Sequence, residues 1–150
     1  MHTNHYGRLL IMTVLSFVSM YALMYAMVDT FANVYPNFNQ FYMAGLMTSP
    51  MVLIELVLMR SMYKDKKANI VIIAASIAAL SAFFLMIRQQ TLVADTQFLK
   101  SMIPHHAAAI LMCKEAPIKD AEIKELCRTI ISSQQKEIDQ MKAKLRALER

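Results

Sequence analysis

Hydrophobic and polar residues are distributed unevenly along this chain. Three apolar stretches, at about residues 9–28, 41–59 and 68–87, each reach the roughly 20 residues that a helix needs to cross a bilayer. After about residue 88 the continuous apolar runs stop, and apolar residues recur at three- and four-residue spacing, which is typical of one helical face. The pattern predicts an all-α chain with a three-span membrane domain over residues 1–88 and a helical domain outside the bilayer over residues 89–150.

The second region contains two predicted helices. Ala116-Pro117 ends the first one, because the residue before a proline is pushed away from helical angles. Asp120 is then placed to cap a second helix over about residues 121–148. Its apolar stripe consists of Ile123, Leu126, Ile130, Ile138, Met141, Leu145 and Leu148. We therefore expect an antiparallel helical hairpin. Since residues 89–94 contain no helix breaker, we also expect the third span to continue into it as one helix.

A hairpin of about 60 residues is marginal on its own, because a domain of this size encloses little apolar surface. Two hairpins from two chains would bury their apolar faces against each other. We expect a homo-oligomer in which they form a four-helix bundle of the ferritin-like type.

Basic residues predict the orientation of the spans. The loop at residues 29–40 has no Lys or Arg, whereas the loop after the second span has Arg60, Lys64, Lys66 and Lys67. Loops rich in these residues stay in the cytoplasm. We expect a multi-pass protein of the bacterial inner membrane, with a cytoplasmic N-terminus and a periplasmic C-terminal domain.

The net charge of +5 does not indicate a nucleic-acid partner. The basic loop is explained by membrane topology, and from residue 89 onward ten Lys and Arg are interspersed with eight Asp and Glu. Membrane lipid is the expected surrounding.

Candidate chemistry concentrates in the run Met102-Ile103-Pro104-His105-His106, followed by Met112. Thioethers together with imidazoles favour Cu(I) or Ag(I) over hard cations. The residue three before His105 is a methionine, not the glutamate of the di-iron carboxylate bundles. Pro104 removes the hydrogen bond to the carbonyl of Lys100, so we expect a kink or a new helix start there.

A hairpin register with Cys113 opposite Cys127 brings the second helix into this site. The candidate metal ligands are then Met102, His106 and Met141, with His105 or Met112 as a fourth ligand or a second site. Gln134 or Glu137 is placed to accept a hydrogen bond from a histidine ring. The alternative is that the methionines fill gaps in a core.

Cys113 and Cys127 leave three interpretations open. In an oxidising compartment they would form a disulfide that closes the hairpin. They could otherwise be buried free thiols, or thiolate ligands of Cu(I).

The second span carries methionines at four-residue intervals, with one acidic residue among them: Met43, Met47, Met51, Glu55 and Met59. A thioether ladder could carry Cu(I), or the methionines could be apolar filler. Glu55 is costly in a bilayer, so it is either a proton or metal site or a partner of Arg60. Near the start of the chain, His2 and His5 are expected in a solvated tail with at most weak metal binding.

Residues 95–145 resemble a ferritin-like domain-of-unknown-function family, number three-hundred-and-five, which includes periplasmic copper- and silver-binding proteins. The resemblance rests on Asp95, Phe98, the run from Met102 to His106, Met112, Ser133-Gln134, Glu137-Ile138 and Met141. It implies a helical bundle and a connection with copper. It implies no established catalytic activity.

The resulting prediction is a membrane-anchored extracytoplasmic protein that binds Cu(I) or Ag(I) for buffering, resistance or transfer. Its partner would be a copper exporter or a periplasmic copper chaperone. One alternative is a structural helical module that docks a partner, with incidental metal binding. Another is a haem or metal redox protein, although the chain has neither C-x-x-C-H nor Glu-x-x-His, and we therefore do not expect an enzyme.

Overall fold

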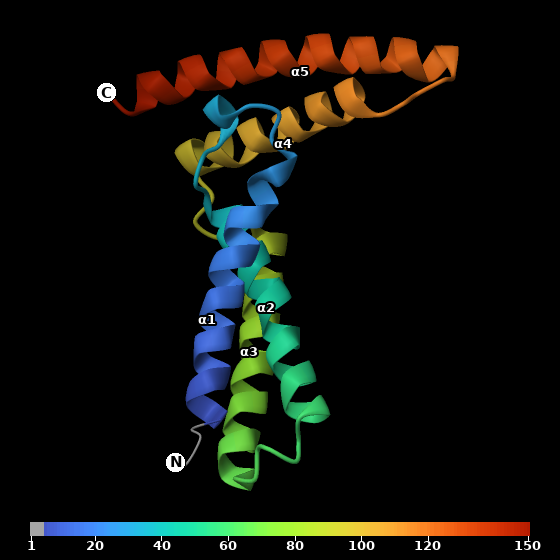
Figure 1. Ribbon diagram of the computed structural model, residues 1–150. Coiled ribbons are helices and arrows are strands. Elements are labelled where there is room, and N and C mark those ends of the chain that lie inside the picture. The colour runs from blue at the N-terminus through green and yellow to red at the C-terminus, as the bar shows by residue number, and fades with distance from the viewer. Residues whose placement is uncertain (1–4) are drawn as a thin grey trace. The chain divides into compact units, whose positions relative to one another are not determined.

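The computed structural model describes residues 5–150, and over this range the chain forms helices and no strands (Figure 1). The elements are α1 (His5–Leu23), η1 (Met24–Met27), η2 (Phe31–Asn33), α2 (Phe38–Leu58), α3 (Lys66–Gln89), α4 (Asp95–Glu115) and α5 (Ala121–Leu148), where η marks short 3-10 helices. The predicted all-α class is confirmed.

The chain divides into two compact units. The span unit contains the residues up to Met24 together with Asn39–Thr91, and the hairpin unit contains Tyr25–Phe38 together with Leu92–Arg150. The segment between the first two spans therefore belongs with the hairpin, which the hydropathy pattern does not indicate.

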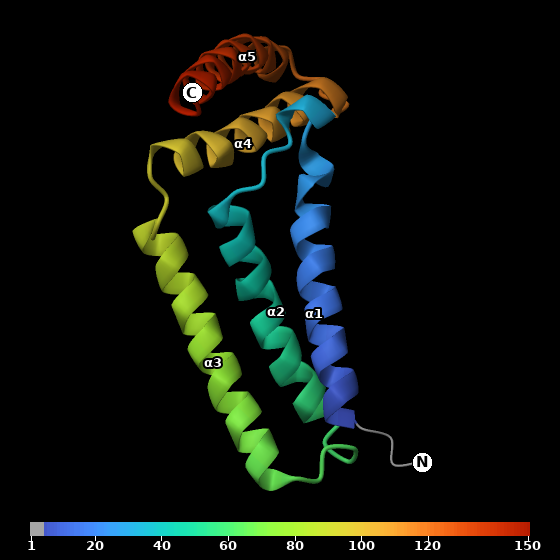
Figure 2. The same cartoon turned by 90° about the vertical axis from the view of Figure 1, so that its left-hand side faces the viewer.

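Three helices of the span unit are long and apolar enough to cross a membrane, as predicted. These helices, α1, α2 and α3, run side by side in both views (Figures 1 and 2). Gly45 on α2 lies against the Phe83 ring of α3, and a Cβ built at this position would overlap the ring. Pro50 lies within α2 without ending it.

Polar side chains occupy the end of the span unit where α1 begins. Asp65 caps α3 by accepting from the backbone N–H groups of Lys67 and Ala68, at 2.9 and 3.1 Å. The Tyr6 hydroxyl donates to the Asn69 side chain at 2.9 Å. His5 is the first residue of α1, with its ring centroid 6.5 Å from that of Tyr63, so it belongs to a helix and not to a tail. His2 lies outside the described residues.

The expected continuous helix from the third span into the hairpin is wrong. α3 ends at Gln89, and Gln90 takes a left-handed conformation with φ 50°. The Gln90 side chain donates to the Ile87 carbonyl at 2.7 Å and also pairs with Asn39. Its amide thus satisfies the helix end without glycine or proline, and the helix stops where composition gives no signal.

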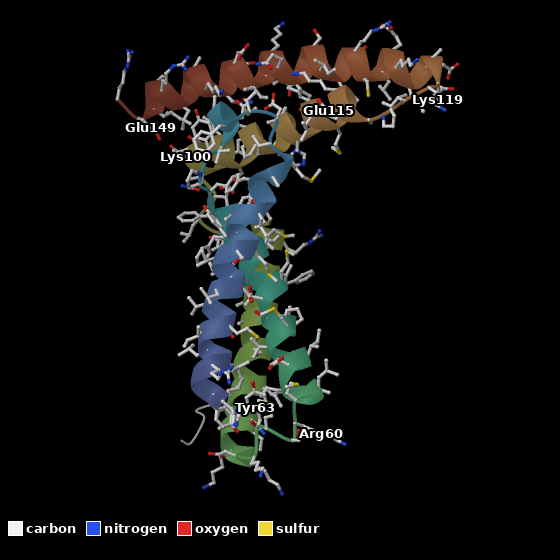
Figure 3. The ribbon with its side chains drawn as sticks, in the orientation of Figure 1. Arg60, Tyr63, Lys100, Glu115, Lys119 and Glu149 are labelled. Carbon is white, nitrogen blue, oxygen red and sulfur yellow. The ribbon has the colours of Figure 1, made fainter. Side chains whose placement is uncertain are left out.

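The end of α4 and both ends of α5, in contrast, are as predicted. α4 ends at Glu115 before an extended Ala116, and the Asp120 carboxylate accepts from the Ile123 backbone N–H at 3.0 Å. α5 then covers Ala121–Leu148 and runs antiparallel to α4 (Figure 2). The Lys100 ammonium lies 2.8 Å from the Glu149 carboxylate near the C-terminal end of α5 (Figure 3).

The hairpin core consists of Leu99, Ile103, Ala107, Ile110, Ile138 and Leu145, against which Val28, Tyr35 and Met141 pack. Val28 and Tyr35 come from the segment between the first two spans. That segment therefore covers apolar surface that two helices alone would leave exposed.

Pro104 neither ends α4 nor starts a new helix, because α4 continues through it. Proline cannot donate to the carbonyl of Lys100. That carbonyl lies 3.4 Å from the Asn37 side-chain amide, which also donates to the Tyr35 carbonyl at 2.9 Å. The side-chain amide of the buried Asn37 thus replaces the backbone N–H that Pro104 lacks as the donor to this carbonyl.

Candidate metal centre

His106 is the buried histidine of the hairpin, with 8% of its surface exposed. Its Nδ1 atom lies 2.9 Å from the carbonyl oxygen of Met102, one turn earlier on α4. Because a carbonyl oxygen can only accept a hydrogen bond, this contact requires the proton on Nδ1. The contact therefore selects one tautomer of the neutral ring, with the lone pair on Nε2.

The Nε2 atom of His106 faces α5, 2.7 Å from Oε2 of Glu137. With Nδ1 protonated, Nε2 donates to an ionised carboxylate only when the ring is an imidazolium. The pair then becomes an ion pair, whose Glu137 side chain is 52% exposed. His106 thus connects the two helices through an atom that would bind a metal if it lost its proton.

The neighbouring His105 has a different environment. Its side chain is exposed, and its ring centroid lies 6.1 Å from that of His106. Successive helical residues point about 100° apart, so one histidine faces α5 and the other faces away. The two histidines are not equivalent, which the sequence does not reveal.

The structure divides the predicted ligand set in two. Met102 and Met141 are half-buried, and Met141 packs against the hairpin core. His105 and Met112 are exposed, with 51% of Met112 accessible. Gln134 is half-buried, but the residue that contacts the His106 ring is Glu137.

Within residues 5–150, no group of three or more His, Cys, Asp and Glu side chains could hold a metal ion. A metal centre made by one copy of the hairpin therefore has two choices. It either includes methionine thioethers among its ligands or has fewer than three protein ligands. This condition disfavours Zn²⁺, whose protein sites combine three or four nitrogen, sulfur or oxygen ligands.

Cys113 and Cys127 are free thiols, each half-buried, and they face each other as the assumed register requires. The hydrogen bond between them, with burial and mutual charge repulsion as smaller causes, raises the pKa of Cys113 to about 11. They line a pocket of about 210 Å³ together with Lys124 and Arg128, two basic residues that the sequence did not single out.

Three methionines of the ladder, Met43, Met47 and Met59, lie at the surface of the span unit. Met43 and Met47 are 39% and 45% exposed. A cavity of about 510 Å³ in the span unit is lined instead by residues of α1, α2 and α3 that include none of Met43, Met47, Met51, Glu55 and Met59. Within the described span unit, an ion in this cavity would therefore not contact the thioethers of the ladder.

Glu55 contacts Tyr63, a partner that the sequence did not suggest. The Tyr63 hydroxyl donates to Oε1 of Glu55 at 3.2 Å. Burial and then the Glu55 charge raise the pKa of Tyr63. Among residues 5–150 no ion pair joins Glu55 to Arg60, and Arg60 extends away from the helices (Figure 3).

Comparison with known proteins places this hairpin in a family. The family model described as "Domain of unknown function (DUF305)" matches residues 58–145, which include α3, α4 and most of α5. The chain belongs to the DUF305 family.

The family match extends beyond the region that carried the resemblance in the sequence, since it includes the third span. A relative named "Uncharacterized protein L153", from Acanthamoeba polyphaga mimivirus, is 35% identical over 136 residues, covering 89% of this chain and 88% of the relative. The similarity therefore includes both units. No solved structure matches the chain.

Proposed function

We propose that this DUF305 protein binds Cu(I) or Ag(I) in its hairpin through Nε2 of His106, for buffering, resistance or transfer of the ion. The observation that carries the proposal is the contact between His106 Nδ1 and the Met102 carbonyl. Metal-binding histidines usually donate their other ring N–H in this way, which orients the ring and fixes the tautomer.

The thioethers of Met102 and Met141 would complete the ligand set. Both side chains are half-buried and lie on the two facing helices. Thioethers remain neutral, so a His and Met set selects a soft monovalent ion without a buried excess of negative charge. The exposed His105 and Met112 would provide a fourth ligand or a second site at the surface.

Metal loading would displace Glu137. An imidazole binds a metal only without its second proton, so an incoming ion exchanges for the Nε2 proton and ends the ion pair. The Glu137 carboxylate, already half-exposed, would then turn toward water. We therefore expect acid to oppose loading through His106, while the thioethers stay available.

The surroundings of the protein are also a proposal. The basic loop after α2 supports a cytoplasmic N-terminus and a hairpin on the outer side of a bacterial inner membrane. Exposed apolar residues of the hairpin, Phe98, Ile123 and Leu126, support pairing with a second copy. The ion would pass to a copper exporter or a periplasmic copper chaperone. Light scattering of the purified protein with and without Leu126→Glu tests the pairing.

The test of metal binding is an anaerobic Cu(I) titration of the full-length protein in detergent against a competing chelator. His106→Ala should weaken binding by at least about tenfold, the lower limit for losing even a supporting residue of a metal site. His105→Ala is the matched control, since it removes an exposed neighbouring imidazole and should have the smaller effect. X-ray absorption of the wild type should detect nitrogen and thioether scatterers.

Removal of both thioethers by Met102→Leu with Met141→Leu keeps the side-chain volume and should also weaken binding. Wild-type affinity in the His106→Ala protein would overturn the proposal.

The second candidate function is a structural one, and a specific observation favours it. Both ring nitrogens of His106 already have partners, so holding α4 against α5 would by itself account for the residue. In that case His106→Ala would lower the thermal unfolding midpoint while Cu(I) affinity stayed unchanged. The hairpin would then be a docking module.

A further inference from the structure

We propose that Cys113 and Cys127 form a separate site that binds one soft monovalent d10 ion, Cu(I) or Ag(I), between two thiolates. The site would lie at the connecting end of the hairpin, marked by Glu115 and Lys119 in Figure 3. It does not depend on the binding of metal by His106.

The positions of the two cysteines support this site. Cys113 belongs to the last turn of α4 and Cys127 to the second turn of α5, and both line the same pocket of about 210 Å³. Each thiol is half-buried, so an ion can reach it from solvent. Cys113 follows His106 by two helical turns, or about 10 Å, which keeps the two sites apart.

The number of donors limits the choice of ion. No third His, Cys, Asp or Glu joins the pair among residues 5–150. Structural Zn²⁺ takes four such ligands, and Mg²⁺ and Ca²⁺ take oxygen ligands. Soft monovalent ions are satisfied by two thiolates, so the pair fits them best.

The charge around the pocket fits the same ion. Lys124 and Arg128 line the pocket, and no carboxylate does. Arg128 pairs with Glu125 at 2.7 Å. Of the two basic residues that line the pocket, Lys124 is the one that forms no ion pair within residues 5–150. A monovalent ion held by two thiolates carries one negative charge, and a nearby ammonium stabilises it.

Binding at this site would require only ligand exchange. The ion forms two metal–sulfur bonds, the two S–H bonds break, and two protons pass to the solvent. No electron is transferred, so neither an oxidant nor a reductant is needed.

The test compares Cu(I) stoichiometry in anaerobic, reduced, full-length protein with Cys113→Ser, Cys127→Ser, the double variant and His106→Ala. We expect the double variant to lose one equivalent of Cu(I) together with the ultraviolet thiolate-to-metal band. His106→Ala should keep that band, which separates failure of this site from failure of the His106 site. Circular dichroism verifies that the serine variants are folded.

Thiol alkylation provides a second measurement. Cu(I) should protect both cysteines of the wild type from N-ethylmaleimide, but should protect the remaining cysteine of either single variant much less. Unchanged stoichiometry in the double variant would overturn the proposal. So would a protein isolated from membranes without reductant whose intact mass and lack of alkylation show a Cys113–Cys127 disulfide.

Discussion

The two units differ most in the side chains that they expose, because each has an apolar core. In the span unit the buried residues of α2 include Gly45, Thr48 and Ser49, whereas Leu10 and Ile70 are 65% and 67% exposed. In the hairpin unit the largest fully buried side chains are Ile103, Ile110 and Ile138, and charged residues of α5 face outward. The exposed apolar side chains on helices long enough to cross a membrane suit the first unit to lipid, and the charged outer face of α5 suits the second to water.

Polar contacts differ in the same way. In the span unit the Thr48 and Ser49 hydroxyls donate to carbonyls of their own helix, at 2.7 and 2.8 Å. In the hairpin unit His106 reaches a carboxylate on the other helix. The Ser49 hydroxyl is therefore satisfied within α2, and the Thr48 hydroxyl also lies 3.5 Å from Sδ of Met20 on α1. In the hairpin unit, by contrast, the His106 contact helps to fix how the two helices meet.

The largest expected effect concerns the apolar core of the hairpin. Ile138→Ala removes a fully buried side chain and should lower the free energy of unfolding of the hairpin by about 2 to 5 kcal/mol. Leu148→Ala is the control on the same helix, because Leu148 is 42% exposed and lies outside the proposed pairing surface, and it should cost about 1 kcal/mol or less. Urea unfolding in detergent, followed by circular dichroism, measures both. Equal costs would mean that the hairpin core is not as described.

The next effect tests the small-residue packing of the spans. Gly45→Val places side-chain atoms where the Phe83 ring lies, and overpacking of this kind costs about 1 to 3 kcal/mol. Phe83→Ala should recover part of that loss in the double variant, because it empties the space. The detergent-solubilised variants are compared by heat inactivation, measured as the loss of the monodisperse peak. If the double variant is no better than Gly45→Val, the two helices do not meet at this point.

A smaller effect concerns the segment that covers the hairpin. Asn37→Ala leaves the Lys100 carbonyl without its side-chain donor and should cost about 1 to 2 kcal/mol. Pro104→Ala restores a backbone N–H for the same carbonyl, so in that background Asn37→Ala should cost measurably less. A double-mutant cycle on urea unfolding measures this coupling. A coupling of zero would show that Asn37 does not compensate for the proline.

The sequence predicted much of the fold, because two of its signals are physically strong. Long apolar runs identified the three spans, and Pro117 with Asp120 identified the boundaries of the hairpin helices. The break after α3 was missed, because a left-handed Gln90 stabilised by its own side chain has no distinctive composition.

The candidate site was predicted less completely. Helical spacing placed His105 on one face with Met102, and His106 beside that face, but it could not show that His106 is the buried histidine or that Glu137 holds its Nε2. The contacts of Asn37 and Tyr63 were also missed, because they join residues 63 and 8 positions apart through loops that periodicity does not describe.

A modest change in metal affinity is expected at the contact between the hairpin helices. Glu137→Gln removes the carboxylate that holds Nε2 of His106, so Cu(I) meets less competition for this atom. A net hydrogen-bond contribution of about 1 kcal/mol corresponds to roughly fivefold tighter Cu(I) binding. Glu122→Gln, an exposed change on the same helix, should leave the affinity unchanged. Chelator competition measures both variants, and weaker binding by Glu137→Gln would make Glu137 a supporting residue of the metal site.

The smallest expected effect concerns Ser49, a buried polar residue of α2 in the span unit. Ser49 is buried, yet its hydroxyl donates to the Gly45 carbonyl of the same helix, a carbonyl that also takes part in the helix itself. Ser49→Ala should therefore change the free energy of unfolding by less than about 0.6 kcal/mol, the average for hydrogen bonds between membrane helices. The same heat-inactivation assay as for Gly45→Val measures it. A loss comparable to that of Gly45→Val would show that the hydroxyl holds α2 to a neighbouring helix, so the two units would not differ in how they use buried polar groups.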